Sequence, residues 1–246
     1  MELTDRVALV TGSTSGIGRA VAQALAARGA HVLVSGRDEE RGAKTVAAIR
    51  ADGGRADFLP ADLRDADSAR DLARRAVETG GRVDILVNNA GIGVFGPTEA
   101  VSEAEFDAAY AVNVKAPFFL VAGLAPGMAE RGGGAIVSVT TMVAGFGQAG
   151  MALYGSSKAA VALLTKAWAA EFGPHGVRVN AVSPGPTRTE GTAPMGDALD
   201  QLASQAPAGR VADPREIAEA VAYLVGDGAG FVQGVVLPVD GGRTAV

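Results

Sequence analysis

Cysteine is absent from this 246-residue sequence, which excludes disulfides, thiolate nucleophiles and cysteine metal sites. Histidine is nearly absent, since His31 and His175 are too few for a recognisable metal cluster and are expected to be structural or solvent-facing. Runs of basic residues are also missing, and the net charge is -5. Nucleic acid or an anionic membrane surface is therefore not expected as the main partner, and a small molecule is favoured.

Long apolar runs are missing as well. The longest weakly polar stretch, residues 116–129, contains two prolines and is shorter than the roughly 18 to 20 residues that a bilayer span needs. The N-terminal segment has acids where a signal peptide carries positive charge, and its apolar run ends within five residues. We therefore expect a soluble cytoplasmic protein without a membrane partner.

The composition is that of one folded domain. Hydrophobic residues make up 48% and charged residues 20% of the chain, so a large core can form. The 34 glycines are spread along the sequence, and no segment resembles a linker. We expect a single domain over residues 1–246.

Short β-rich runs alternate with longer segments of helical spacing, such as residues 18–29 and 215–226. Near-continuous apolar strands separated by helices predict an α/β fold: a doubly wound, seven-stranded parallel sheet with helices on both faces and right-handed crossovers. Ligands of such sheets bind at the carboxyl ends of the strands. The predicted strands are residues 7–11, 31–35, 57–61, 84–88, 135–139, 177–182 and 235–239.

The first strand is followed by TGSTSGIG, in which Gly12, Gly16 and Gly18 precede a helical segment. Glycines there let the backbone turn tightly and approach a pyrophosphate at the helix N-terminus. The same glycines also suit a tight turn for steric reasons alone. Their spacing is Gly-x-x-x-Gly-x-Gly, which differs from the common dinucleotide pattern Gly-x-Gly-x-x-Gly.

Polar residues follow later strands. NNAG at residues 88–91 suits a backbone lying against a flat ring, although an ordinary turn has a similar composition. Thr141 follows the fifth strand, and Tyr154 and Lys158 come thirteen and seventeen residues later. The spacing of Tyr154 and Lys158 places both on one face of a helix. Alone, the pair also fits a packed aromatic ring beside a snorkelling lysine.

With these motifs the sequence resembles the short-chain dehydrogenase/reductase family over essentially its whole length, including members such as 3-oxoacyl-[acyl-carrier-protein] reductases and polyketide ketoreductases. The resemblance implies one Rossmann-like domain that uses NAD(H) or NADP(H). It also implies a catalytic tetrad of Asn113, Thr141, Tyr154 and Lys158. The motifs are TGSTSGIG at residues 11–18, Asp62 in ADL, NNAG at 88–91, Asn113 in NVKAP, YGSSK at 154–158, SPGPTRT at 183–189 and VDGG at 239–242.

The resemblance assigns a role to each tetrad member. Tyr154 is the acid/base, and the Lys158 ammonium is expected to lower the pKa of its phenol and to bind the nicotinamide ribose. Asn113 supports a water molecule that relays protons. The expected cofactor-binding residues are Gly12, Ser13, Thr14, Ser15, Gly16, Ile17, Gly18, Arg37, Asp62, Leu63, Asn89, Ala90, Gly91, Tyr154, Lys158, Pro184, Gly185, Thr187 and Thr189.

Thr141 departs from the family pattern, which usually has serine at this position. Threonine keeps the hydroxyl group and adds a methyl group that tightens the site and restricts the side chain. Ser138 lies sixteen residues before Tyr154, which is the wrong spacing, and Thr140 should point to the opposite face of an extended strand. Thr141 is therefore the expected hydrogen-bonding residue.

Cofactor choice depends on the end of the second strand, where Gly36 occupies the position at which NAD-specific members usually carry aspartate. Arg37 follows, and a guanidinium can bind a 2′-phosphate with two hydrogen bonds. NADP(H) is favoured. NAD(H) is possible if Asp38 binds the ribose instead, and Arg37 could also be an ordinary solvated residue.

The sequence leaves the substrate open. Residues 187–210 are small, polar and proline-punctuated, and they predict a mobile lid over a carbonyl or secondary alcohol, including 3-oxoacyl or polyketide-type thioesters that can be carrier-protein-bound. Two other readings are an NADP(H)-binding protein without turnover and a dehydratase or epimerase on the same scaffold. Residues 159–170 are apolar on nearly every face, which predicts a second buried face. Because this helix joins subunits in the family, a homotetramer is expected, with a dimer as the alternative.

Overall fold

The computed structural model describes residues 2–246, which contain seven strands in one sheet with all neighbouring pairs parallel. The strand order is β3-β2-β1-β4-β5-β6-β7, so the predicted doubly wound α/β fold is confirmed. The strands are β1 Val7–Thr11, β2 His31–Gly36, β3 Arg55–Pro60, β4 Ile85–Asn88, β5 Gly134–Val139, β6 Val177–Pro184 and β7 Val236–Val239.

The strand boundaries differ from the predicted ones mainly at two places. β3 begins at Arg55, two residues early, because Arg55 pairs with His31 at the start of β2. β6 continues to Pro184, since Ser183 and Pro184 still pair with β7. Tertiary pairing with a neighbouring strand sets these ends, which local composition does not reveal.

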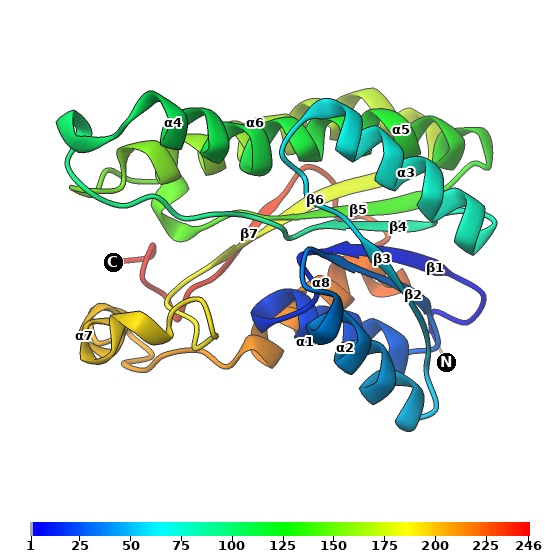
Figure 1. Ribbon diagram of the computed structural model, residues 1–246, viewed down its shortest axis with the longest axis horizontal. Helices are drawn as coiled ribbons and strands as arrows, with labels where there is room; N and C mark the ends of the chain where they lie inside the picture. The colour runs from blue at the N-terminus through cyan, green and yellow to red at the C-terminus, as the bar shows by residue number, and fades with distance from the viewer. Residues whose placement is uncertain (1) are drawn as a thin grey trace.

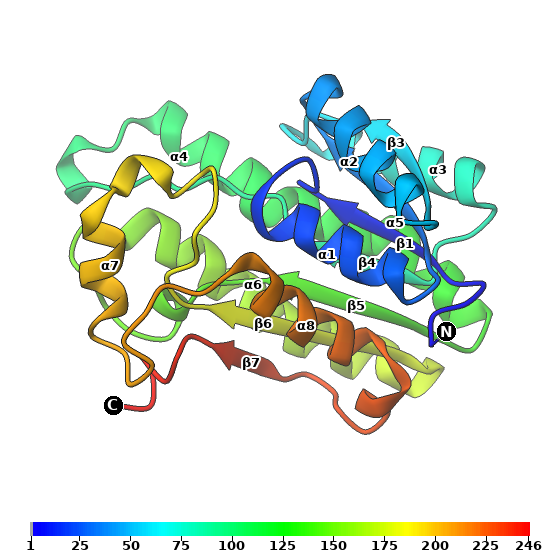
Figure 2. The same ribbon diagram turned by 90° about the horizontal axis from the view of Figure 1, so that it is seen from below.

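Helices cover both faces of the sheet (Figures 1 and 2). One layer holds α1 Gly16–Ala27, α2 Glu39–Ala51 and α8 Pro214–Val225. The other holds α3 Ala66–Gly80, α4 Glu103–Tyr110, α5 Ala116–Glu130 and α6 Ala152–Phe172. A short helix, α7 Asp197–Ala203, lies apart from both layers near the C-terminus (Figure 1). Strand order reverses between β1 and β4, the place where such sheets bind ligands.

Alternating residues of the strands build two separate cores. In β1, Ala8 and Val10 join the core beneath α1 and α8, whereas Val7 and Leu9 join the core beneath α3 and α5. All four side chains are buried because a parallel sheet between two helical layers has no wet face. This explains why the strands appear in the sequence as uninterrupted apolar runs.

α4 and α5 are joined by a π-helical segment, Ala111–Lys115, into one continuous helix from Glu103 to Glu130. Judged by length and composition alone, this helix is the one among residues 2–246 that is long enough and apolar enough to cross a membrane. Half of its apolar window is buried inside the protein, and Leu120, Val121 and Leu124 belong to the core beneath α3. A long apolar helix that is buried in a protein core meets the same criterion of length and composition.

The two histidines lie outside the site described below. His31 Nε2 is 2.6 Å from Asp57 Oδ2, a pair that links β2 to β3, and His175 is exposed. No group of three or more metal-ligating side chains occurs among residues 2–246.

Candidate active site

A cavity of about 850 Å³ opens at the carboxyl ends of the strands. It is lined by the loops that follow each of the strands β1 to β6 and by the segment around α7. The lining includes all of the predicted site residues except Ser13, Gly18 and Asn113, which lie behind it. We call its part beside the β1 and β2 loops the cofactor end, and its part beside Phe95, Tyr154 and α7 the substrate end.

Glycines shape the cofactor end because the β1 and β4 loops approach each other closely. Gly12 and Gly16 have φ of +62° and +52°, which favour glycine. A Cβ at Gly12 would lie 2.9 Å from Ala90 Cα, and one at Gly18 would overlap Asn89 Nδ2. The loop therefore presents bare backbone to the cavity and begins α1 directly afterwards.

Ser13 is a structural residue of this loop. Its Oγ donates to the Val10 carbonyl (2.6 Å) and accepts from the Ser35 N–H (2.9 Å), and the residue is fully buried. Asn89 Nδ2 donates to the carbonyl of Gly12 (3.1 Å). These bonds fix the path of the loop between β1, β2 and β4.

The end of β2 combines a glycine with one free arginine. A Cβ at Gly36 would lie 2.7 Å from Thr14 Cγ2, so a larger residue does not fit without movement. Asp38 begins α2: its Oδ1 accepts from the Arg41 N–H (2.9 Å) and its Oδ2 from Arg41 Nε (2.6 Å). Arg37 is exposed, lines the cavity and forms no hydrogen bond or ion pair with residues 2–246.

The Asp38 carboxylate is therefore already occupied on both oxygens. Hydrogen bonds from the Arg41 backbone and side chain lower the pKa of Asp38, so it stays ionised as the cap of α2. The sequence alone leaves open whether Arg37 or Asp38 faces a bound ribose. Because its carboxylate is bonded to Arg41, Asp38 is less available than Arg37 to contact a bound ribose.

Further loops complete this end. Asp62 and Leu63 follow β3 and line the cavity, with Asp62 exposed and Leu63 buried. After β6, Gly185 packs against the backbone of Asp240, where a Cβ would come within 2.8 Å of its Cα. Thr187 Oγ1 donates to the Gly185 carbonyl (2.9 Å). The predicted residues Pro184, Gly185, Thr187 and Thr189 thus lie together along one wall.

Tyr154 and Lys158 lie on the first turns of α6, as their spacing predicts. Tyr154 forms a side-chain hydrogen bond with Thr141, and its ring contacts Phe95 edge-on at 5.4 Å between centroids. Thr141 is extended at the end of β5, with φ -163° and ψ 153°, which turns its side chain into the cavity. The structure thus brings the expected hydroxyl donor to the expected phenol.

The electrostatics of this pair differ from the prediction. Burial raises the pKa of the Tyr154 phenol, and the hydrogen bond with Thr141 opposes that rise only in part. The expected lowering by Lys158 does not appear. Lys158 is itself buried, which lowers its pKa to about 8, and its Nζ donates to the Val139 carbonyl (2.9 Å). Burial, which the spacing of two residues does not reveal, is the dominant cause.

Asn113 lies in the π-helical segment behind the cavity. Its Oδ1 accepts from the Ile92 N–H (2.9 Å), and its Nδ2 donates to the Ile92 carbonyl (2.9 Å) and to Ser157 Oγ (3.0 Å). The side chain is buried and joins the loop after β4 to α6. It therefore holds two walls of the site together, and a role in proton relay remains a prediction.

The two alternative hydroxyl residues point elsewhere. Thr140 Oγ1 donates to the Val182 carbonyl (2.8 Å), on the β6 side of the strand. Ser138 is fully buried, with its Oγ 3.5 Å from Asn88 Nδ2. Thr141 remains the hydroxyl residue that contacts Tyr154.

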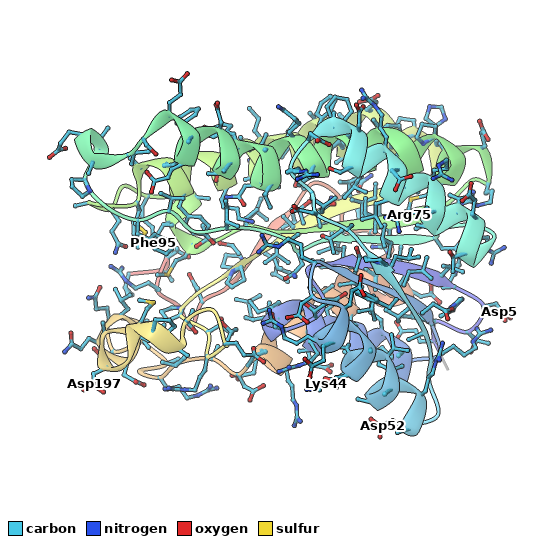
Figure 3. All side chains as sticks on the ribbon, in the orientation of Figure 1. Asp5, Lys44, Asp52, Arg75, Phe95 and Asp197 are labelled. Atoms are coloured by element: carbon cyan, nitrogen blue, oxygen red, sulfur yellow. The ribbon has the colours of Figure 1, made fainter. Side chains whose placement is uncertain are left out.

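Sequence reasoning missed most of the substrate end. Its walls are the segments 92–95 and 142–151, which a hydrogen bond from the Gly96 N–H to the Gly150 carbonyl joins (2.9 Å), together with α7. Phe95 lies at the same end of the molecule as Asp197, the first residue of α7 (Figure 3). These residues form no motif, so only folding brings them together. The side chains missed are Ile92, Phe95, Met142, Val143, Gln148 and Met151.

The predicted lid, residues 187–210, folds into a 3-10 turn, Ala193–Met195, and α7. Met195, Leu199 and Leu202 line the cavity, and the role of the segment as a lid stays a prediction. Its mobility remains a prediction.

The sequence of the chain is similar to those of known enzymes over nearly its whole length. The family model described as Enoyl-(Acyl carrier protein) reductase matches residues 12–244. The chain is 40% identical to a 2,5-dichloro-2,5-cyclohexadiene-1,4-diol dehydrogenase of Sphingobium indicum, over 98% of this chain and 96% of the relative. It is 38% identical to a cyclopentanol dehydrogenase of Comamonas sp., over 99% and 98% of the two chains.

A solved structure described as a short chain dehydrogenase/reductase family protein is 49% identical and covers 100% of both chains with a TM-score of 0.93. Relatives with this fold act on CH–OH groups, and the family uses a nicotinamide dinucleotide. The chain belongs to the short-chain dehydrogenase/reductase family and is an oxidoreductase of alcohols and ketones.

Proposed function

We propose that the protein is an NADP(H)-dependent oxidoreductase that interconverts an uncharged ketone and its secondary alcohol. The observation on which this rests is the asymmetry of the cavity. Charged side chains line the cofactor end, whereas the substrate end holds the Tyr154–Thr141 pair within apolar walls.

The residues present fit a dinucleotide. The glycines leave bare backbone at the start of α1, where a pyrophosphate binds in folds of this type, and Asp62 and Leu63 line the adenine side. Gly91 leaves space beside Lys158, since a Cβ there would lie 3.1 Å from Lys158 Nζ. When bound, the nicotinamide supplies the hydride that passes to or from the substrate carbon.

Tyr154 and Thr141 then act on the substrate oxygen, one by proton transfer and the other by hydrogen bonding. Tyr154 is protonated at neutral pH, since an ordinary phenol has a pKa of about 10 and burial raises that of Tyr154 further, and it can donate its proton to the carbonyl oxygen during reduction. The Thr141 hydroxyl, already bonded to Tyr154, is placed to donate to the same oxygen as negative charge develops. Lys158 contributes positive charge beside this pair whenever it is protonated.

Arg37 supports the preference for NADP(H). It is the cationic side chain at the end of β2 without a partner among residues 2–246, while Arg41 is engaged by Asp38. A 2′-phosphate therefore meets a free guanidinium, and a ribose without phosphate meets no free carboxylate at the end of β2. NAD(H) use would require Asp38 to accept from the ribose hydroxyls while it also caps α2 and pairs with Arg41.

The walls of the substrate end support an uncharged substrate. The residues that line it include no aspartate, glutamate or arginine, and its one polar amide is Gln148. A carboxylate placed there would be desolvated with only Lys158, which is buried and already bonded to the Val139 carbonyl, as a counter-charge, and this is costly. Small cyclic alcohols such as those named for the two relatives fit this chemistry better than sugar acids. A carrier-bound 3-oxoacyl thioester is the alternative, since its charged part could remain outside.

The test is an assay of purified protein with NADPH that follows the absorbance of the reduced cofactor. Cyclohexanone and cyclopentanone are compared with 4-oxocyclohexanecarboxylate, which adds one charge, and with an acetoacetyl thioester. We expect kcat/KM for the neutral ketones to exceed that for the carboxylate by at least about tenfold. Preference for the carboxylate would contradict the proposal, and no consumption with any substrate would favour the binding protein or the epimerase.

Assembly as a homotetramer in the cytoplasm is part of this proposal. In the single chain Leu163 of α6 is 69% exposed and Phe118 of α5 is 44% exposed, so the outer face of these helices is apolar. Such a face is normally covered in an oligomer. Light scattering after size exclusion measures the mass, and we expect four chains of 24.7 kDa each; a monomer would contradict this.

A further inference from the structure

Glu190, which lies three residues past Thr187 in the segment after β6, reaches the first turn of α1. Its Oε2 accepts a hydrogen bond from the Gly16 N–H (2.9 Å), and its Oε1 forms an ion pair with Arg19 Nη2 (2.7 Å). Gly16 is 174 residues away from Glu190 along the chain, so the contact is formed only in the folded protein. Both Glu190 and Arg19 are about half exposed.

The start of α1 has no side-chain cap of its own, which sets it apart from four other helices. α2, α3, α4 and α8 begin with Asp38, Asp65, Ser102 and Asp213, whose side chains accept from the first turn. In α1 the residue at this position, Ser15, forms no such bond, and the first turn has no acid. The exposed N–H groups and the helix dipole therefore favour an anion from elsewhere.

Glu190 meets this requirement as an ionised group. Partial burial raises the pKa of Glu190, but backbone N–H groups, including that of Gly16, and the charge of Arg19 outweigh this effect and hold the pKa below its usual value. The carboxylate also lines the cavity. It thus occupies an N–H group at the start of α1, the place where a dinucleotide pyrophosphate binds in this type of fold.

We propose that Glu190 is an internal competitor for the cofactor pyrophosphate, and that cofactor binding releases it and frees the segment before α7. Two anions cannot share the Gly16 N–H, and their like charges repel each other. The inference goes beyond the proposed function: it requires only that a dinucleotide binds, and it is independent of the substrate and of the choice between NADP(H) and NAD(H).

Release of Glu190 would move its neighbours as a unit. The Thr189 N–H donates to Thr192 Oγ1 (2.9 Å), and Thr192 Oγ1 donates to the Thr187 carbonyl (2.8 Å), which makes residues 187–192 a compact turn. Met195 and α7 follow directly and line the substrate end. Occupation of the cofactor end is thereby linked to the wall of the substrate end.

The first experiment measures dissociation constants by calorimetry for the wild type and Glu190→Gln, which removes the charge at nearly constant size. The ligands are NADP⁺ and ADP-ribose, which contain a diphosphate, and adenosine 2′-monophosphate, which does not. We expect Glu190→Gln to bind the two diphosphate ligands about three- to tenfold more tightly and the monophosphate unchanged. Unchanged or weaker binding of ADP-ribose would overturn the proposal, as would equal tightening of all three ligands.

The matched control is Asp200→Asn, because Asp200 is another exposed acid of this segment and pairs with Arg188 (2.8 Å) rather than with α1. It should change none of the three constants, and tightening equal to that of Glu190→Gln would overturn the proposal. A second measurement is hydrogen exchange in residues 187–203 without any turnover. ADP-ribose should speed exchange there in the wild type, and Glu190→Gln should exchange faster even without ligand; slower or unchanged exchange in both would contradict release.

Discussion

The cofactor end and the substrate end of one cavity are built in different ways. At the cofactor end, backbone contacts fix residue identity: Gly12 and Gly18 have no room for a side chain beside Ala90 and Asn89. At the substrate end, side chains from three separate segments form apolar walls around Tyr154. A wall of this kind tolerates many residues of similar size, whereas a close backbone approach tolerates only glycine. This difference explains why the class of cofactor can be predicted from the sequence, whereas the substrate cannot.

If the two ends are separable, a change at Tyr154 should abolish turnover without affecting cofactor binding. Tyr154→Phe removes the transferable proton and keeps the ring against Phe95, so we expect kcat to fall by roughly 10² to 10⁴. Steady-state kinetics measure kcat, and fluorescence titration measures the Kd for NADPH. If Tyr154→Phe keeps more than about a tenth of wild-type kcat, or if its Kd for NADPH changes greatly, the two ends of the cavity are not independent.

Thr141 offers a finer test at the same end. Thr141→Val keeps the shape and deletes the hydroxyl that bonds Tyr154, so kcat/KM should fall by roughly two orders of magnitude. Thr141→Ser keeps the hydroxyl and should remain active, with altered discrimination between bulky and small ketones because the methyl group is gone. An active valine variant would show that another donor serves the substrate oxygen.

At the cofactor end, Arg37→Ala should change cofactor discrimination and leave substrate discrimination intact. We expect the wild type to favour NADPH over NADH in kcat/KM by at least roughly tenfold, about 1.4 kcal/mol, and the variant to lose most of this margin. Relative kcat/KM values for two ketones in the same variant serve as the internal control. A wild type that prefers NADH would show that Asp38 contacts the ribose.

Lys158 lies where the two ends of the cavity meet. Its burial should change how the free energy of unfolding depends on pH. Its pKa falls to about 8 on folding from 10.5, so the unfolded chain binds more protons between these values and stability rises with pH across that range. Below pH 8 the buried charge makes the protein less stable than at high pH by roughly 3 kcal/mol. Replacing the lysine also removes its bond to the Val139 carbonyl, which reduces the gain in stability.

Lys158→Met should therefore raise the free energy of unfolding at pH 7 by about 1 kcal/mol, while abolishing catalysis and weakening cofactor binding. Urea unfolding of the apoprotein at several pH values measures this, and the gain should shrink as pH rises from about 8 toward 10.5. Lys166→Met on the exposed side of α6 is the matched control and should show no such trend. A destabilised Lys158→Met protein at pH 7 would contradict the account.

The sequence by itself determined the strand and helix alternation, the glycine loop, and the positions of Thr141, Tyr154 and Lys158. Local rules are sufficient for these features, because apolar runs, glycines before a helix and i,i+4 spacing act over short distances along the chain. The same rules explain why the Thr140 side chain bonds to β6 and not to Tyr154, since alternate residues of an extended strand face opposite ways.

Only the tertiary structure decided how these parts behave together. Burial reversed the expected shift in the pKa of Tyr154, because desolvation depends on everything packed around a group and not on its neighbours in sequence. The walls around Phe95 and α7 and the contact of Glu190 with Gly16 join segments far apart in the chain. Such long-range contacts follow from packing of the whole domain, which short sequence patterns do not encode.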